Sequence, residues 1–331
     1  MKKLFFLLAC AAISVLSFGQ DNQLVWANGH LLYGTPVESI DSLTYDEMQD
    51  IDTLHLLLPR TLIKVVHDTV YIHDTVYVET DCGDEDDTSS AGIGVFSVSA
   101  DKQVTFSKGN LQYHPANDEW RFAPSQLDYI GEANSNCSST YNGWLDLFGW
   151  STSSTNFGVS TSTDYNDYLG SFVDWGTNKI GNDAPNTWRT LSYYEWDYLL
   201  NTRTNASVLK GVAQVNGVNG LIFLPDNWTC PAGVTFKSGF HSEMGVDYYA
   251  AYQTFTAAEW SKLESAGAVF LPAAGYRDGP GVYGVQNYGF YWSATEYASY
   301  HAGSLCFYSS EAGVGNDYRD CGNSVRLVKD L

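Results

Sequence analysis

The feature that most constrains the fold is the texture of residues 94–331, where short apolar and aromatic stretches alternate with Gly, Asn, Ser and Asp turns. Such stretches, separated by turn-forming residues, are typical of short β-strands. Examples lie at 95–98, 104–106, 120–122, 305–308 and 324–328. Aromatic residues make up 15% of the chain, with 23 Tyr and 10 Trp, which is too many for a disordered chain. We therefore expect 94–331 to form one domain of many short antiparallel strands.

Two segments of this domain predict short helices. Ser192 and Thr256 each stand three residues before a Glu, which is the capping-box arrangement that satisfies free amides at a helix start. Each helix then places a Trp and a Leu three residues apart on one face. These pairs are Trp196 with Leu199 and Trp260 with Leu263. Two short helices among many strands indicate an α+β fold.

The N-terminus predicts export. Lys2 and Lys3 precede an apolar run over 4–18, and small Gly19 comes before polar residues, which is typical of a secretory signal peptide over 1–19. The run is too short to span a bilayer comfortably. In a second interpretation, residues 7–10 form a lipobox and Cys10 anchors a lipoprotein to the outer membrane. Both interpretations predict a secreted or cell-surface protein.

Residues 20–93 predict β structure before the domain. Asn28-Gly29 between two apolar runs predicts a hairpin, so 20–46 is expected to be a short β unit. Within 47–93, the six residues 67–72 recur almost unchanged at 73–78. Their aliphatic residues stand at every second position, and this period of two predicts extended strand. Two hexads cannot bury a face alone. We therefore expect an extended stalk that self-associates between chains, followed by an acidic linker.

Charge and motif content exclude several classes of function. The net charge of -21 would repel nucleic acid. The sequence has no Cys-x-x-Cys pair, no Gly-x-Ser-x-Gly elbow and no phosphate loop. We therefore predict no catalytic residues, no metal site and no cofactor.

Four ordered blocks between 95 and 331 resemble a known family. The blocks are 188–196 (Trp-Arg-Thr-Leu-Ser followed by Glu-Trp), 270–277, 291–296 and 324–328. They are similar to the signature of a paralogous domain family first noticed in Fibrobacter and abundant in secreted proteins of Bacteroidetes. At 191–192 this chain has Leu-Ser where the family often has Leu-Pro-Thr.

That family resembles the formylglycine-generating branch of the C-type-lectin-like fold. The resemblance implies a loop-rich, C-type-lectin-like domain whose terminal strands lie near each other. The formylglycine-generating enzymes need two cysteines close in sequence, whereas Cys306 and Cys321 are fifteen apart. Related iron enzymes need a histidine constellation, and His114, His241 and His301 are scattered along the domain. The calcium-binding motifs of sugar-binding lectins are also missing. An enzyme on this fold is the alternative to a binding protein.

The stretch between 297 and 323 is rich in Tyr, Ser, Gly and Asn, the residues that adaptable binding loops use. Every residue there except Glu311 can be encoded by a codon ending in a pyrimidine. Some proteins of this fold are diversified by retroelements that randomise adenines near the C-terminus. Ordinary divergence of paralogues is the alternative.

We therefore predict a non-enzymatic recognition or adhesion protein that binds an unknown protein or glycan ligand. A structural surface or fibre component is a further alternative. Trp292, Leu305, Phe307, Val325 and Leu327 are expected to point inward by strand parity. The remaining residues should form a shallow, outward-facing patch. The predicted ligand-binding residues are Tyr297, Tyr300, His301, Tyr308, Asn316, Asp317, Tyr318, Arg319 and Asp320.

Overall fold

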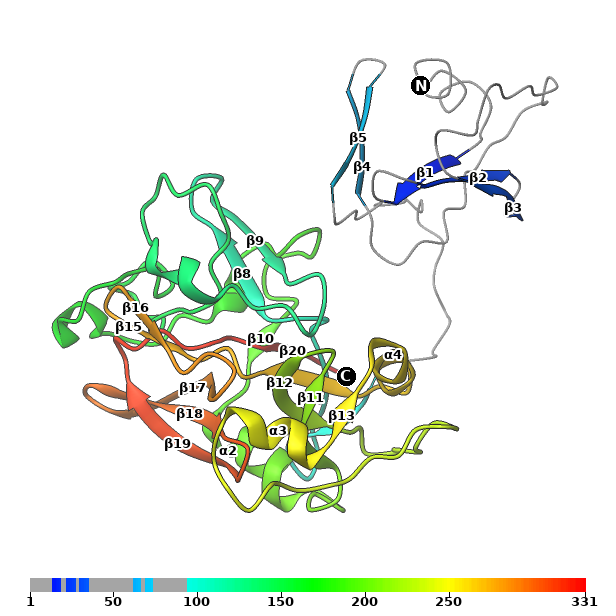
Figure 1. The fold of residues 1–331 in the computed structure, drawn as a ribbon. Coiled ribbons are helices and arrows are strands. Elements are labelled where there is room, and N and C mark those ends of the chain that lie inside the picture. The colour runs from blue at the N-terminus through cyan, green and yellow to red at the C-terminus, as the bar shows by residue number, and fades with distance from the viewer. Residues whose placement is uncertain (1–13, 19–21, 28–29, 36–61, 67–68, 74–93) are drawn as a thin grey trace. The chain divides into compact units, whose positions relative to one another are not determined.

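The computed structural model describes residues 14–18, 22–27, 30–35, 62–66, 69–73 and 94–331 (Figure 1). The chain divides into two compact units, 1–87 and 88–331. The boundary between them lies inside the segment predicted to be stalk and linker. Cys10, the residues 36–61 and the residues 74–93 lie outside the described residues.

The first unit contains an antiparallel sheet of three strands in the order β1-β2-β3. The strands are β1 (Ser14–Phe18), β2 (Asn22–Ala27) and β3 (His30–Thr35). Ala27 pairs with His30 in the register of β2 and β3, which confirms the hairpin predicted around Asn28-Gly29. Strand β1 lies within the predicted signal peptide, so cleavage near Gly19 would remove it.

Of the two hexads, only 69–73 lies within the described residues, and it forms a strand that pairs with the segment before the hexads. Strands β4 (Leu62–Val66) and β5 (Thr69–His73) pair antiparallel, with Val65 opposite Val70 and Ile63 opposite Ile72. The prediction of a continuous extended stalk is therefore wrong for 62–73. The period-two pattern was correct, but a hairpin satisfies its backbone hydrogen bonds within the chain.

In the second unit, the first and last strands of the domain belong to the same sheet. This four-stranded antiparallel sheet has the order β10-β20-β7-β6. The strands are β6 (Phe96–Ser97), β7 (Gln103–Phe106), β10 (Arg189–Thr190) and β20 (Leu327–Asp330). Val328 of β20 pairs with Phe106 of β7, which confirms that the terminal strands of the domain are neighbours.

A second four-stranded sheet has the order β13-β11-β12-β14, and only β13 runs parallel to its neighbour. Its strands are β11 (Lys210–Val215), β12 (Val218–Phe223), β13 (Thr254–Phe255) and β14 (Val269–Pro272). Strands β8 (Leu111–His114) and β9 (Glu119–Phe122) form a separate hairpin.

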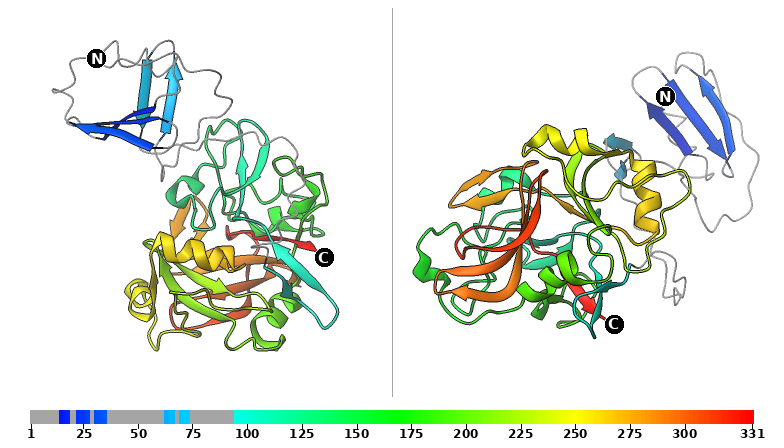
Figure 2. Two further views of the ribbon diagram at one scale, coloured as in Figure 1. Left: turned by 90° about the vertical axis from the view of Figure 1, so that its right-hand side faces the viewer. Right: turned by 90° about the horizontal axis from the view of Figure 1, so that it is seen from below.

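The strands nearest to the predicted site come last in the chain. Strands β15 (Tyr276–Asp278) and β16 (Gly281–Tyr283) form a hairpin. Strands β17 (Gly289–Ala298), β18 (His301–Phe307) and β19 (Ala312–Tyr318) form a three-stranded antiparallel sheet. These three strands lie side by side in every view (Figures 1 and 2). Since β19 has a partner on one side only, it is the edge of this sheet.

Both predicted helices are present, and both begin with the predicted capping box. They are α2 (Tyr193–Asp197) and α4 (Ala257–Ser265). Gly267 follows α4 with a φ of 90°, a left-handed conformation that suits glycine at a helix end. A third helix, α3 (Val246–Tyr252), was not predicted, and its N-cap Gly245 makes no side-chain hydrogen bond.

Short helical turns complete the described part of the domain. They are η2 (Gly131–Ser135), η3 (Tyr165–Tyr168), η4 (Trp175–Thr177) and η5 (Tyr198–Thr202). Short helices and mixed sheets confirm the α+β class. None of the helices in the described ranges is long and apolar enough to cross a lipid bilayer.

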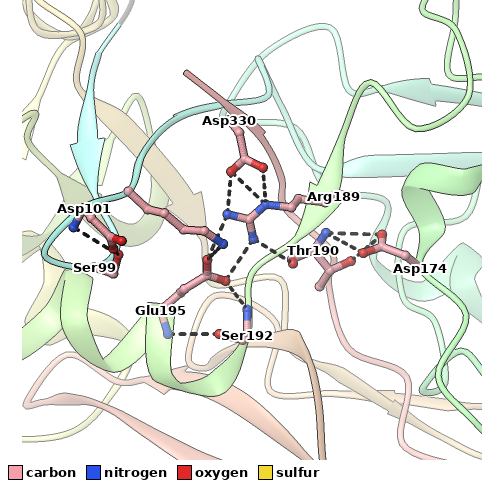
Figure 3. Close-up of polar contacts among 9 residues, drawn as sticks. Ser99, Asp101, Asp174, Arg189, Thr190, Ser192, Glu195 and Asp330 are labelled. Atoms are coloured by element: carbon pink, nitrogen blue, oxygen red, sulfur yellow. Dashed lines mark hydrogen bonds and ion pairs between the residues drawn. The ribbon is translucent and has the colours of Figure 1, made fainter.

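Arg189 connects the sheet β10-β20-β7-β6 to helix α2 (Figure 3). Its guanidinium donates to both oxygens of Glu195, at 2.9 Å each, and to Asp330 at 2.7 Å. Glu195 also accepts a hydrogen bond from the amide of Ser192 as part of the capping box. The Trp-Arg block of the sequence therefore ties β10, β20 and the start of α2 together.

Candidate ligand-binding face

The first half of β17 and most of β18 are buried, whereas β19 is half-buried or exposed along its length. Tyr291 and Leu305, which are opposite each other in the register, pack in one hydrophobic cluster, whereas Trp292 packs in another. The five residues predicted to point inward have exposed fractions of 0% or 1%. The strand parity of this region was therefore predicted correctly. The accessible parts of the sheet are therefore β19 and the end formed by the β17–β18 turn.

Three of the predicted site residues meet a fourth aromatic residue at one end of the sheet. Tyr318 stacks on Tyr165 of η3, with ring centroids 5.1 Å apart and planes at 18°. Tyr300 lies 5.5 Å from the same ring, and His301 lies 4.3 Å from the Tyr318 ring. Tyr165, Tyr300 and Tyr318 are 39%, 42% and 44% exposed. We call Tyr165, Tyr300, His301 and Tyr318 the tyrosine cluster.

Arg319 does not point outward, and the prediction that it binds a ligand directly is contradicted by its burial. Its exposed fraction is 2%. The guanidinium pairs with Glu296 at 2.7 Å, donates to the Ala298 carbonyl at 2.9 Å, and lies 4.5 Å above the Trp150 ring. These contacts hold the β17–β18 turn, so Arg319 supports the tyrosine cluster from below.

Asp320 is also buried, with an exposed fraction of 5%, which contradicts the prediction of an outward position. Burial raises the pKa of its carboxyl group, and the neighbouring acids Asp278 and Asp317 raise it further. One carboxyl oxygen of Asp320 has no hydrogen-bond partner. The sequence could not predict this burial, because aspartate is rarely buried without a partner.

Tyr308, Asn316 and Asp317 line a separate cavity of about 560 Å³. Other aromatic and acidic residues that line it are Tyr276, Tyr288, Phe290 and Glu311. Burial raises the pKa of Asp317 and of Tyr308. We call this cavity the aromatic trough. It shares no residue with the tyrosine cluster, so the predicted single patch is two sites.

Tyr297 belongs to neither group. It is 59% exposed, and its ring lies 6.4 Å from Tyr193 at the start of α2. Tyr193 in turn contacts Tyr194, which is 75% exposed. The register shift in β17 between Trp292 and Ala298 alters the strand pairing near Tyr297.

Sequence reasoning missed Tyr165, Tyr276, Tyr288 and Phe290 as site residues. Tyr165 is more than a hundred residues before β18 in the chain, and only the tertiary fold brings it there. The composition of 297–323 drew attention to one segment, whereas both sites also draw residues from outside it.

The histidines and cysteines of the described domain form no common site. His114 contacts Trp144, His241 stacks on Tyr248 and His301 contacts Tyr318. Cys137, Cys230, Cys306 and Cys321 are free thiols. Among the described residues, no three His, Cys, Asp or Glu side chains gather in a way that could hold a metal ion.

Comparison with known proteins gives one match. Residues 253–328 match the model of a domain of unknown function (DUF8237). The match runs from β13 to β20 and includes α4, the sheet β17-β18-β19 and most of the aromatic trough. It excludes Tyr165 and the Arg189 block. No curated protein and no solved structure shows significant similarity to the chain.

Proposed function

We propose that this is a secreted or surface-attached, non-enzymatic recognition protein whose C-terminal domain is C-type-lectin-like. The resemblance of four sequence blocks to the paralogous family supports this assignment. The pairing of β20, the last strand of the domain, with β7 near its start agrees with it. The signal-like N-terminus supports export, with a lipoprotein anchor at Cys10 as the alternative.

The tyrosine cluster is the observation that carries the proposal. Exposed rings at Tyr165, Tyr300 and Tyr318 lie against one another, and the buried Arg319 fixes the turn below them. Tyrosine rings present a large contact area at low entropic cost, and each hydroxyl adds a hydrogen-bonding group. A prearranged aromatic surface of this kind suits a protein or glycan ligand.

The test is a double variant, Tyr300→Ala with Tyr318→Ala, compared with the wild-type protein on an array of glycans and mucin glycoproteins. We expect the array signals of the wild type to be lost. The thermal midpoint should change by only a few degrees, because exposed side chains contribute little to stability. The matched control is Tyr194→Ala, which removes a tyrosine that is 75% exposed on α2.

Equal array signals from the double variant and the wild type would refute binding at the tyrosine cluster. Diversification by a retroelement has a separate test. Sequencing the gene across its source population should show substitutions concentrated at codons of 297–323 and sparse at Leu305 and Phe307, which are buried.

A further inference from the structure

The aromatic trough has a floor and walls made of aromatic rings. The Phe290 ring stands at 80° to Tyr276, at 77° to Tyr288 and at 88° to Tyr308. The centroid separations of these pairs are 5.6, 6.3 and 6.4 Å. Tyr288 and Tyr308 also pack edge to face, with centroids 5.1 Å apart, so the rings form one connected cluster, and four of them line the cavity. A cation gains from the faces of aromatic rings through the ring quadrupole.

On one face of β19, the successive positions Gly313 and Gly315 have no side chain, and we call them the glycine strip. Register places Phe290 opposite Cys306, and Cys306 opposite Gly313, so all three lie on one face of the sheet. A Cβ added to Gly313 would meet no atom within 4 Å, and one added to Gly315 would meet only the Cys306 sulfur, at 3.9 Å. Neither glycine has a positive φ. The backbone does not require glycine here, and its effect is to leave space.

Carboxylates stand at both ends of the glycine strip. Glu311, Gly313, Gly315 and Asp317 alternate along one face of the strand, and Glu311 and Asp317 both line the trough. Six residues of strand separate their Cα atoms by about 20 Å. The residues that line the trough include no Lys or Arg. The lining of the trough therefore combines aromatic rings with one carboxylate from each end of the glycine strip.

We propose that the aromatic trough binds a linear aliphatic polyamine. The terminal ammonium groups lie at Glu311 and Asp317, and the methylene chain lies over Gly313 and Gly315 against the rings. Methylene stems with cationic ends commonly cover apolar surface in this way. Two carboxylates this far apart do not provide the six to eight oxygen ligands of a calcium ion. The proposal rests on the trough alone and does not depend on the tyrosine cluster.

The experiment is isothermal titration calorimetry of the full-length protein with spermine at physiological ionic strength. Spermine is a linear tetraamine whose terminal nitrogens are far enough apart to approach two carboxylates at the ends of about 20 Å of strand. Hexaamminecobalt(III) is the comparison probe, because it is also a multivalent cation but is compact. The net charge of -21 attracts both ions, whereas only spermine has the length of the trough. We expect one saturable site for spermine that hexaamminecobalt(III) does not displace. Equal binding of both ions, or no binding of spermine, would overturn the proposal.

Three variants locate the site. Gly313→Val fills the strip without a steric clash and should weaken binding at least tenfold while preserving the thermal midpoint, since valine suits a strand. Tyr308→Leu removes one π face and should weaken binding about five- to thirtyfold. Glu311→Gln should weaken the binding of spermine more than the binding of the monovalent probe butylamine.

Wild-type affinity in a stably folded Gly313→Val protein would show that the ligand lies elsewhere. The double variant Tyr300→Ala with Tyr318→Ala should retain full spermine affinity, because neither residue lines the trough. Loss of glycan binding with retained spermine binding would separate the two sites. Loss of spermine binding in that double variant would place the polyamine at the tyrosine cluster and refute the proposal.

Discussion

Arg319→Met is the substitution that best separates a supporting role from a ligand-binding role. Methionine retains much of the buried packing volume but removes the charge and every side-chain donor. The arginine makes an ion pair with Glu296, whose side chain is 59% exposed, so that pair contributes at most about 1 kcal/mol. The hydrogen bond to the Ala298 carbonyl, at 2.9 Å, contributes about 1.5–3 kcal/mol because its donor is charged.

The contact with the Trp150 ring adds to the stabilisation that Arg319 contributes. The guanidinium lies 4.5 Å from its centroid in a buried setting, which is worth about 1–2 kcal/mol. The contacts of the methionine side chain recover part of the loss. We therefore expect Arg319→Met to lower the free energy of unfolding by about 3 kcal/mol. For a domain of this size, the thermal midpoint would fall by roughly 6–12 °C.

Urea unfolding followed by tryptophan fluorescence is the appropriate assay. Only Trp26 of the 10 tryptophans precedes the second unit, so the signal reports on the domain that contains Arg319. The control is Tyr300→Ala, which should change stability by less than about 0.5–1 kcal/mol because the side chain is exposed. If Arg319→Met keeps the wild-type midpoint but loses ligand binding, Arg319 contacts the ligand and the supporting role is wrong.

Two further predictions concern the contacts of helix α2. Burial raises the pKa of Glu195, but hydrogen bonds from Arg189 and Ser192 outweigh burial and hold the pKa below its ordinary value; Arg189 likewise lowers the pKa of Asp330. The stability that these carboxylates contribute is present above their unfolded pKa and is lost as pH falls through the folded pKa. Arg189→Met should therefore lower the free energy of unfolding by about 2 kcal/mol at about pH 6 and by much less at about pH 3, measured by urea titration. An equal cost at both pH values would refute the ionic contribution. Ser192→Ala removes the N-cap acceptor of the Glu195 amide and should cost about 1 kcal/mol, measured by the same titration, and no change in midpoint would show that the cap is not stabilising.

The sequence predicted correctly those features that depend on residues close together in the chain. The capping boxes at Ser192 and Thr256 involve residues three apart, so the sequence contains both partners. Strand parity placed Leu305 and Phe307 inside for the same reason. Helix α3 was missed because Gly245 provides no side-chain cap and no capping residue signals its start. Local rules therefore predict elements that contain their own start signals.

A weakly marked turn and one long-range contact account for the remaining errors. The hairpin of β4 and β5 was missed because His67-Asp68, between the strands, offers Asp as its only common turn residue and contains no Gly or Pro. Arg319 was expected to be exposed because most arginines are, yet it donates to the Ala298 carbonyl and lies 4.5 Å from the ring of Trp150. Trp150 is far away in the chain, and no pattern within 297–323 indicates that contact.

The blocks that carry the family resemblance lie mainly in the framework of the domain. Each of three blocks contains one arginine that contacts another part of the domain. Arg189 reaches Asp330 beside the last block, and Arg326 donates to the Phe270 carbonyl of the second block at 2.6 Å. Arg277, fully buried, packs against Gly322, where an added Cβ would lie 2.8 Å from its side chain. The blocks thus contribute to the framework, while Tyr165, Tyr300, Tyr308 and the glycine strip of β19 lie outside them. A relative that keeps these arginines can keep the fold and still bind a different ligand.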